Sequence, residues 1–354
     1  MGNGATLRGG LIGCGFVSQY HLAGWADVPG ARLVAVCDLL PERLDWARRY
    51  APEAQAFTDA AAMLEAFEDG ESGKLDFVEV CTRPESHREL VELAARHGAH
   101  VLCQKPAALV RWDLRAMIDA CDAAGVRLMF HENWRFRPWY RALKDEIDAG
   151  AVGRPIRIRL AHRDTRAIRP EGFAEQPYLA DLPRLILMEM GCHLVDTARY
   201  LMGEVREVAA MLGRFGEGHP GEDVATLNLR FASGALGLLD ISWCAPADLA
   251  RPEWALNQTV VEGTAGTLRL VADGSLEHVS PRGQLSRRAV PLPPEERVYL
   301  DGYNATQAHF IAGLLDGREH ETHGTETLKT MDVIWAGYRS AEEGRVIPVL
   351  AGPA

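Results

Sequence analysis

The chain has 354 residues, of which 47% are hydrophobic and 25% charged, a composition typical of a globular protein with about two domains. Its formal net charge is −11, and so acidic a chain is a poor partner for nucleic acid or an anionic membrane surface. No apolar run approaches the roughly 20 residues of a membrane-spanning helix, so we expect no partner among nucleic acids or membranes.

The first third of the chain alternates short apolar runs with helical segments. The runs are mostly continuous, as expected for parallel strands that are buried on both faces. The predicted strands are Gly10–Ile12, Leu33–Cys37, Gln55–Phe57, Phe77–Cys81, His100–Cys103 and Val126–His131. The predicted helices are Ser18–Val28, Pro41–Tyr50, Ala60–Phe67, Ser86–His97 and Arg111–Ala124. This α/β pattern predicts a Rossmann domain over residues 1–130, with a doubly wound parallel sheet.

A glycine turn follows the first strand, with Ser18 at the third small position of the fingerprint. Gly13 permits a sharp turn, and the missing side chain of Gly15 lets backbone N–H groups approach a pyrophosphate at the amino end of the next helix. The backbone that would hold the pyrophosphate belongs to Gly13, Gly15, Phe16 and Val17.

Asp38 ends the second strand, where a carboxylate can accept hydrogen bonds from a ribose 2′-hydroxyl and would repel a 2′-phosphate. We therefore expect NAD as the cofactor, and NADP is disfavoured. The alternative is an ordinary tight turn with a solvated aspartate.

The pattern changes after residue 130, and residues 131–354 are predicted to form an α+β domain. Its strands are Ile156–Leu160, Val205–Phe215, Val224–Phe231, Ala235–Trp243, Gln258–Glu262, Thr267–Ala272 and Leu276–Ser280. They form a large, mostly antiparallel open sheet. Helices are expected only around 139–149, 191–202 and 304–316, which leaves one face of the sheet for another subunit. We therefore expect a homo-oligomer that assembles through this sheet.

A long irregular stretch, residues 163–185, separates the first strand of this domain from the helix that follows. Loops of this length are commonly lids over a site or disordered segments, and the aromatic residues Phe173 and Tyr178 favour a lid or pocket wall. Arg163 and Tyr178 are therefore candidate substrate residues.

In a doubly wound sheet, ligands bind beyond the carboxyl ends of the strands, and polar residues follow three of the predicted strands there. Pro106 fixes Lys105 at one of these ends, where the lysine can donate to a substrate hydroxyl or carbonyl oxygen. His131 is a candidate for substrate contact. The candidate cofactor residues at these ends are Thr82, Arg83, His87, Gln104, Lys105, Asn133 and Trp134.

Glu189 and His193 are spaced i and i+4, so they share one face of a helix if that helix starts at Glu189. A carboxylate that holds an imidazole suits a general base that draws a proton from an alcohol. The alternative is a surface pair.

Arg135, Arg137 and Arg141 are interpreted as a solvated or domain-bridging face, and His309, His320 and His323 as a solvent-facing loop.

The seven cysteines are scattered, odd in number and mostly inside apolar strands, and they form no Cys-x-x-Cys pair, so we expect neither a disulfide framework nor a zinc site. We predict free thiols, no bound metal and a cytoplasmic location.

Several of these segments together resemble the Gfo/Idh/MocA family. They are the Gly-x-Gly-x-x-Ser turn with Asp38, the segment Thr82–His87, the Lys105-Pro106 pair, the segment Glu189–Asp196 and the ending Ser340–Arg345. The resemblance covers essentially the whole chain and implies NAD(P)-dependent oxidation of sugars or cyclitols. It also implies that Lys105 and His193 are catalytic, with Glu189 as the partner of the histidine.

Two residues depart from the family pattern, since Gln104 stands where glutamate is usual and Glu189 where aspartate is usual. Cys103–Pro106 together with His131–Arg135 is similar to the branch of the family that includes D-apiose dehydrogenase. Two alternatives within the resemblance remain open, an NAD-dependent glycosidase and a non-catalytic nucleotide-sensing regulator.

Overall fold

The computed structural model describes residues 6–68, 73–247 and 258–349, and the chain forms two compact units. The first unit comprises residues 1–133 and 300–328, and the second comprises 134–299 and 329–354. The sequence-based division near residue 130 placed residues 300–328 in the second domain, whereas the contacts of this segment group it with the first unit. The chain therefore contributes to the first unit twice.

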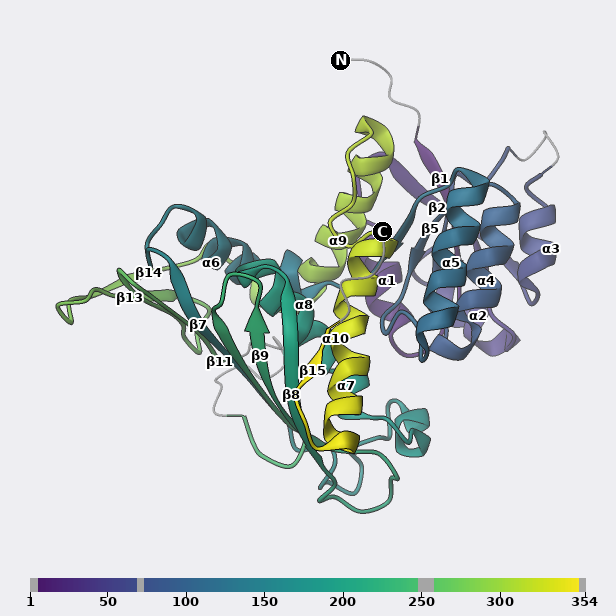
Figure 1. Cartoon of the computed structure of the whole chain (residues 1–354). Helices are drawn as coiled ribbons and strands as arrows, with labels where there is room; N and C mark the ends of the chain where they lie inside the picture. Colours follow the sequence, from purple (N-terminus) through teal and green to yellow (C-terminus); the bar gives the residue numbers. More distant parts are fainter. Residues whose placement is uncertain (1–5, 69–72, 248–257, 350–354) are drawn as a thin grey trace. The chain divides into compact units, whose positions relative to one another are not determined.

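The first unit is built on a six-stranded parallel sheet with the order β3-β2-β1-β4-β5-β6 (Figure 1). The strands are β1 (Leu7–Ile12), β2 (Ala31–Cys37), β3 (Gln55–Phe57), β4 (Phe77–Val80), β5 (His100–Cys103) and β6 (Leu128–Phe130). The helices are α1 (Ser18–Trp25), α2 (Pro41–Ala47), α3 (Ala60–Glu65), α4 (Pro84–Arg96), α5 (Arg111–Ala124) and α9 (Val298–Asp316, from residue 300 on). This order confirms the predicted doubly wound Rossmann topology.

A side-chain cap marks the start of one helix of this unit, and aromatic packing joins two of its helices to the sheet. The Asp59 side chain accepts a hydrogen bond from the N–H of Ala62 and so caps α3. Phe77 of β4 is fully buried, and its ring lies 4.8 Å from that of Trp25 in α1 and 5.9 Å from that of Phe310 in α9. Helices α1 and α9 therefore cover the same face of the sheet.

The second unit contains a nine-stranded sheet with the order β14-β13-β12-β11-β7-β10-β9-β8-β15. Only the β7–β10 pair is parallel among its described pairings, which confirms the predicted mostly antiparallel sheet. Its strands are β7 (Pro155–Arg163), β8 (Val205–Gly213), β9 (Val224–Phe231), β10 (Leu236–Ser242), β11 (Gln258–Gly263), β12 (Gly266–Leu270), β13 (Leu276–Val279), β14 (Leu285–Arg288) and β15 (Ile347–Pro348). Its α-helices are α6 (Pro138–Asp148), α7 (Ile186–Glu189), α8 (Gly191–Met202) and α10 (Gly324–Glu343, from residue 329 on).

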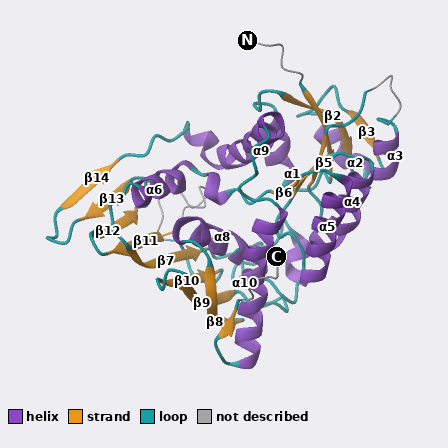
Figure 2. Ribbon diagram, turned by 45° about the horizontal axis from the view of Figure 1, so that its top comes forward, coloured by secondary structure: helices purple, strands orange, loops and turns teal. Residues whose placement is uncertain are grey.

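Helix α10 was missed in the sequence, where only three helical segments were expected after residue 130. It lies on the sheet beside α7, since a Cβ atom at Gly337 would be 3.3 Å from Leu187 of α7 and 3.6 Å from Leu227 of β9. The side chain of Ser340 accepts a hydrogen bond from the N–H of Ala210 in β8 at 2.9 Å. Helices α6, α8 and α10 lie along one face of the sheet (Figures 1 and 2).

Along the strands of this sheet, side chains that point to the covered face alternate with side chains that point to the other face. Along β9 and β10 the inward side chains are buried, while the outward ones are half-buried or exposed. The outward side chains include Leu236, Leu238 and Met211, of which Met211 is 79% exposed. A partly exposed surface of mixed character therefore remains on this unit, with these apolar side chains beside Arg230 and Asn228.

Residues 163–185, expected to form a lid or pocket wall, pack within the second unit. Leu179 and Leu185 are fully buried. The ring of Phe173 lies 5.4 Å from that of His219 and 6.1 Å from that of Trp243. The segment thus packs within the second unit through buried side chains and contains one 3-10 turn, Pro177–Asp181.

Candidate active site

The glycine turn of the first unit has the geometry that a dinucleotide requires. Gly13 has φ +95°, and a Cβ there would lie 2.7 Å from the carbonyl oxygen of Cys81, so only glycine is tolerated. A Cβ at Gly15 would meet no atom within 4 Å, which leaves open space beside its backbone. The hydroxyl of Ser18 is buried and donates to the Gly15 carbonyl oxygen at 2.7 Å. The open backbone at the start of α1 fits a pyrophosphate.

Asp38 ties the end of β2 to this turn. Its carboxylate accepts the N–H of Cys14 at 2.7 Å and the N–H of Leu40 at 2.9 Å, and Arg43 approaches it to 3.6 Å. Each carboxylate oxygen can accept a further bond, so these contacts leave capacity for ribose hydroxyls. Burial raises the pKa of the Cys14 thiol to about 12, so this residue acts as a small hydrophobic group within the turn.

His87 holds two of the predicted strand ends together. It is fully buried, and its ring nitrogens lie 3.1 Å from the carbonyl oxygens of Thr82 and Ala107. Burial lowers the pKa of His87. A side chain so enclosed braces the loops after β4 and β5, whereas Thr82 and Arg83 in the same loop are partly or fully exposed.

Gln104 and Lys105 follow β5, and Lys105 is joined to Pro106 through a cis peptide bond. The Gln104 side chain is buried, and its Oε1 accepts the N–H of Lys105 at 2.6 Å. Its Nε2 lies 2.6 Å from Nε2 of His21 in α1. His21 in turn contacts Glu79 of β4 through Nδ1 at 2.8 Å.

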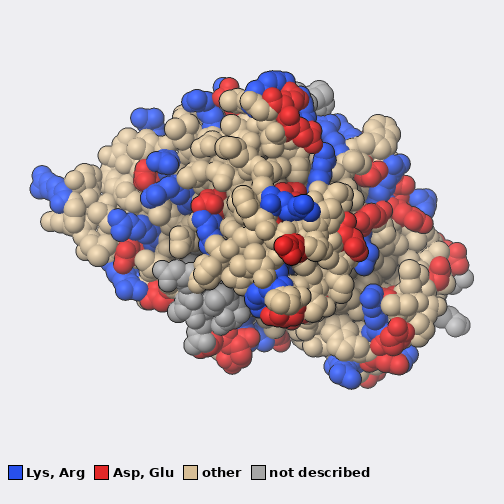
Figure 3. All heavy atoms as spheres, turned by 90° about the horizontal axis from the view of Figure 1, so that it is seen from below, with Lys and Arg blue, Asp and Glu red and all other residues tan. Residues whose placement is uncertain are grey.

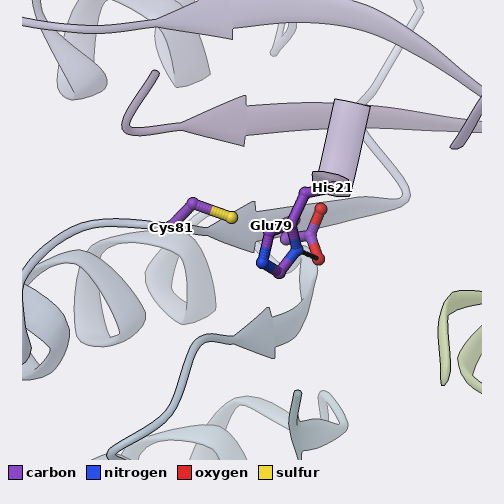
Figure 4. Close-up of side chains that lie close together, drawn as sticks. All are labelled: His21, Glu79 and Cys81. Atoms are coloured by element: carbon purple, nitrogen blue, oxygen red, sulfur yellow. Dashed lines mark hydrogen bonds and ion pairs between the residues drawn. The ribbon is translucent and has the colours of Figure 1, made fainter. Parts of the chain in front are cut away.

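His21 and Glu79 were missed in the sequence, and both are fully buried (Figure 4). A signal was available, because Glu79 is a lone charged residue within the apolar run Phe77–Cys81. His21, Glu79 and Cys81 each have one potential metal-ligand atom within 4.8 Å of those of the other two. Both nitrogens of His21 already have hydrogen-bond partners, and burial raises the pKa of Cys81 well above its usual value. The group is therefore a hydrogen-bonded cluster of the interior.

His131 and Asn133 follow β6 and are both buried. The His131 ring lies 4.3 Å from the ring of His21 and 5.2 Å from that of Tyr303 in α9. His131 is thus part of the same interior cluster.

A cavity of about 350 Å³ lies elsewhere in this unit, lined by residues that include Val126, Arg127 and His323. These residues lie beside the amino end of β6, and the Arg127 guanidinium already donates to carbonyl oxygens of Gly313 and Gly317. Because ligands of doubly wound sheets bind at the carboxyl ends of the strands, this cavity lies away from the expected cofactor site.

In the second unit, His193 lies under an aromatic ring. It stands in the first turn of α8 and is 6% exposed, and the Trp134 ring stacks on it with centroids 4.5 Å apart and planes 4° from parallel. Glu189 ends α7, and Met190 separates it from α8, so the two predicted partners come from consecutive helices.

Arg135 holds this arrangement together, which corrects the expectation of a solvated or bridging basic face. It is buried and donates to both oxygens of Asp196 in α8, at 2.8 and 2.6 Å. Arg137 is also fully buried, with its guanidinium over the rings of Trp139 and Tyr299. A bidentate Arg–carboxylate pair fixes geometry as well as charge, so it sets the Trp134 segment against α8.

Of the other candidates, Arg163 ends β7, and its guanidinium donates to the backbone carbonyl oxygen of Asp240 in the neighbouring β10 at 2.8 Å and pairs with the Asp240 carboxylate. Tyr178 lies in the 3-10 turn of residues 177–181 and is half-buried.

Comparison with known proteins extends these observations. Residues 7–132 match an oxidoreductase family described by its NAD-binding Rossmann fold, and residues 140–269 match the GFO/IDH/MocA C-terminal domain. No helix among the described residues is long and apolar enough to cross a membrane.

Three similar proteins illustrate the match. D-apiose dehydrogenase of Paraburkholderia graminis is 41% identical over 96% of this chain and 89% of its own length. Myo-inositol 2-dehydrogenase of Thermotoga maritima is 29% identical over 96% of this chain and 98% of its own.

The third is an oxidoreductase from Agrobacterium radiobacter whose structure was solved with NAD⁺, L-tartaric acid and magnesium. It aligns with a TM-score of 0.89 at 33% identity and covers 98% of this chain and 99% of its own. Since the two family matches together span more than half of the sequence, this chain is a member of the GFO/IDH/MocA oxidoreductases, with an NAD-binding Rossmann domain.

Proposed function

We propose that this protein oxidises a CH–OH group of a sugar or polyol with NAD⁺. The observation that carries the proposal is Lys105 at a strand end of an NAD-binding Rossmann sheet, beside a buried hydrogen-bonded support. The relatives act on D-apiose and myo-inositol, so a branched or simple pentose and a cyclitol are the first substrates to test.

NAD⁺ supplies the nicotinamide ring that accepts a hydride. The backbone of Gly13, Gly15, Phe16 and Val17 binds its pyrophosphate, and Asp38 binds the adenosine ribose. The remaining cofactor contacts that we propose come from Thr82, Arg83, Gln104, Lys105, Asn133 and Trp134, and His87 acts through the loops that it joins.

Lys105 and His193 are the proposed proton-handling pair. His193 takes the proton of the substrate hydroxyl, with Glu189 as the group that orients the imidazole, and Lys105 stabilises the developing negative charge on the oxygen. The contact between Trp134 and His193 supports this role, because stacking fixes the plane of the imidazole. His131, Arg163 and Tyr178 complete the proposed substrate contacts.

The Lys105→Ala variant tests the assignment. Loss of the lysine removes a proton-handling group, so turnover should fall about 10²- to 10⁴-fold, while the affinity for NADH stays within about threefold because the pyrophosphate and ribose contacts remain. Stopped-flow or steady-state NADH formation measures the first quantity, and fluorescence titration measures the second. The exposed Lys74 of the same unit provides the control Lys74→Ala. Turnover of Lys105→Ala near that of the control would contradict the assignment.

The same assay separates the other candidates that share the cofactor. A dehydrogenase accumulates NADH in proportion to the substrate consumed. A glycosidase that uses NAD catalytically accumulates none at steady state, and a sensor consumes no substrate at all.

We also propose that the protein assembles as a homodimer or homotetramer through the outward face of the nine-stranded sheet. The partly exposed apolar side chains of that face support this, including Leu236 and Met211. Acidic and basic side chains are interspersed over the surface that Figure 3 shows. The seven cysteines are free and six of them are buried, which supports a reducing cytoplasm.

A further inference from the structure

Glu79 is a fully buried carboxylate in the centre of a parallel sheet, where an ionised group needs several hydrogen-bond donors. It has three: Nδ1 of His21 at 2.8 Å, Nε1 of Trp25, and Nε2 of Gln307 at 3.4 Å. Trp25 and Gln307 can only donate to it through these atoms. Glu79 is therefore the fixed acceptor of the cluster.

The side-chain amide of Gln104 determines which nitrogen of His21 carries the proton. Its Oε1 accepts the backbone N–H of Lys105, so its NH₂ group is the one that faces His21. An NH₂ group only donates, and the ring atom that it meets, Nε2 of His21, must therefore be an unprotonated acceptor. The proton of the neutral imidazole is then on Nδ1, where it is donated to Glu79.

We propose that His21 is a positioning residue for Lys105, held as the neutral Nδ1–H tautomer between Glu79 and Gln104 so that the Gln104 amide fixes the backbone of Lys105. The chain of bonds runs from Glu79 through His21 and Gln104 to the Lys105 N–H, and each distance with His21 or Gln104 is between 2.6 and 2.8 Å. This role rests on the proposed function, in which Lys105 is the catalytic group.

The groups around His21 are consistent with this assignment. Besides Glu79 and Gln104, the titratable neighbours are His131 after β6, Tyr303 in α9 and Cys81 after β4. Burial keeps the Cys81 thiol protonated by raising its pKa, so it adds no negative charge. Glu79 is the one carboxylate facing the ring among the described residues, and Nε2 of His131 lies 4.0 Å from it. Because Trp25 and Gln307 also donate to Glu79, its charge is stabilised without a proton on Nε2 of His21.

This arrangement predicts what an isosteric change does. Gln104→Glu replaces the donating NH₂ group with a carboxylate oxygen, which only accepts. His21 would then lie between two carboxylates and should take up a second proton. Residue 104 has no ionisable group in the native chain. In Gln104→Glu it would have one, so the hydrogen bond between residue 104 and the Lys105 N–H would become dependent on pH.

The first test reads the tautomer directly in the full-length protein. In ¹⁵N-histidine spectra of the twelve histidines, the His21 signals, identified by their loss in His21→Leu, should show a protonated Nδ1 and an unprotonated Nε2 at neutral pH. In Gln104→Glu both nitrogens should be protonated, and the pH profile of kcat/KM should gain one ionisation. A native Nε2–H tautomer or a doubly protonated native His21 would overturn the proposal, as would a Gln104→Glu spectrum identical to the native one.

The second test compares two substitutions in the same helix. His21→Leu removes the bond to Gln104, and Trp25→Phe removes a different donor to Glu79 and leaves that bond in place. His21→Leu should lower kcat about 10²-fold, as misplacement of a catalytic group does, with little change in KM for NAD⁺. It should also speed hydrogen exchange at the Lys105 amide about fivefold to tenfold, the equivalent of one lost hydrogen bond.

Trp25→Phe should leave that exchange rate unchanged, and equal rates in the two variants would overturn the proposal. The exchange rate and the spectra are measured without turnover. A failure of the proposed function would appear instead as native protein that forms no NADH from any sugar or polyol.

Discussion

Asp38 has two roles at the residue scale, because the carboxylate that is expected to bind ribose also anchors the glycine turn. It accepts the N–H of Cys14 within the fingerprint itself. Arg43 lies 3.6 Å away and is 49% exposed. An arginine at this place can bind a 2′-phosphate where no carboxylate competes for it, so the preference for NAD rests on a balance between two neighbouring side chains.

Asp38→Ser should therefore shift cofactor preference towards NADP⁺. Removal of the carboxylate takes away its repulsion of the 2′-phosphate and frees Arg43 to bind that phosphate. We expect the ratio of the kcat/KM values for NADP⁺ and NAD⁺ to shift about 10- to 100-fold, which corresponds to about 1.4 kcal/mol for each factor of ten. Parallel assays with NAD⁺ and NADP⁺ measure that ratio. In Asp38→Ser/Arg43→Ala the gain should disappear, and a double variant that retains it would show that Arg43 is not involved.

Single residues also show how far the sequence could lead. Lys105, His193 and Gly13 could be proposed as site residues because each follows a strand or opens a helix in a pattern with chemical meaning. His21 was not, because nothing in a helix sequence says which side chain faces a carboxylate 58 residues away. Arg135 was assigned to the surface because arginine is rarely buried, and its pairing with Asp196 depends on packing between segments that are far apart in sequence.

At the scale of elements, the strands were easier to predict than the helices of the second unit. Alternating or continuous apolar runs gave every strand of the Rossmann sheet and seven of the nine strands of the second sheet, the exceptions being the exposed β14 and the two-residue β15. Helix α10 was missed because it is buried on more than one side, and its buried positions include Thr330 and Asp332 beside Met331 and Val333. A helix so enclosed shows no single apolar stripe.

The segment 320–323 was also misread, as a solvent-facing loop. His323 forms a bridge with Met129 of β6, and the Thr322 hydroxyl donates to the carbonyl oxygen of Phe130. His320 is buried, with Nε2 2.9 Å from the carbonyl oxygen of Phe310. The segment therefore extends the edge of the Rossmann sheet and links it to α9.

His320 should make the stability of this element dependent on pH. Burial lowers its pKa from 6.5 to about 4, so the unfolded chain binds a proton that the native state does not bind between those values. The free energy of unfolding should therefore fall as the pH drops from 6.5 to 4, by up to about 3 kcal/mol at 1.36 kcal/mol per pH unit.

His320→Gln keeps a donor for the Phe310 carbonyl and cannot titrate. Urea unfolding from pH 8 to pH 4 should show a smaller loss of stability in the variant than in the native protein. The comparison at pH 8, where His320 is neutral in both states, measures the cost of the substitution itself. Parallel curves over the whole range would contradict this origin of the pH dependence.

For the whole molecule, the helices that cover the second sheet differ from those expected, and we still propose assembly through the outward face of this sheet. The sequence suggested too few helices to cover both faces of the second sheet. Helix α10 is an additional helix on this sheet, whereas the expected helix around 304–316 belongs to the first unit. That helix lies on the face already covered by α7, as the contacts of Gly337 show. The outward side chains of β8, β9 and β10 keep their alternating, partly exposed pattern, so a large sheet face is still available to a second copy of the chain.

Leu238→Asp tests this assembly. Leu238 points outward from β10, opposite Asn228 of β9 and Arg159 of β7. Stable association requires an interface of about 1,000 Å² or more. A charge at position 238 would be buried in such an interface, at a cost of roughly several kcal/mol. The native protein should sediment at two or four times the 38.9 kDa of one chain, and Leu238→Asp at the mass of one. Leu315, 55% exposed at the end of α9 in the first unit, gives the control Leu315→Asp, which should keep the native mass. A native protein that sediments as a single chain at micromolar concentration would refute the proposed interface, as would a Leu238→Asp variant that keeps the native mass.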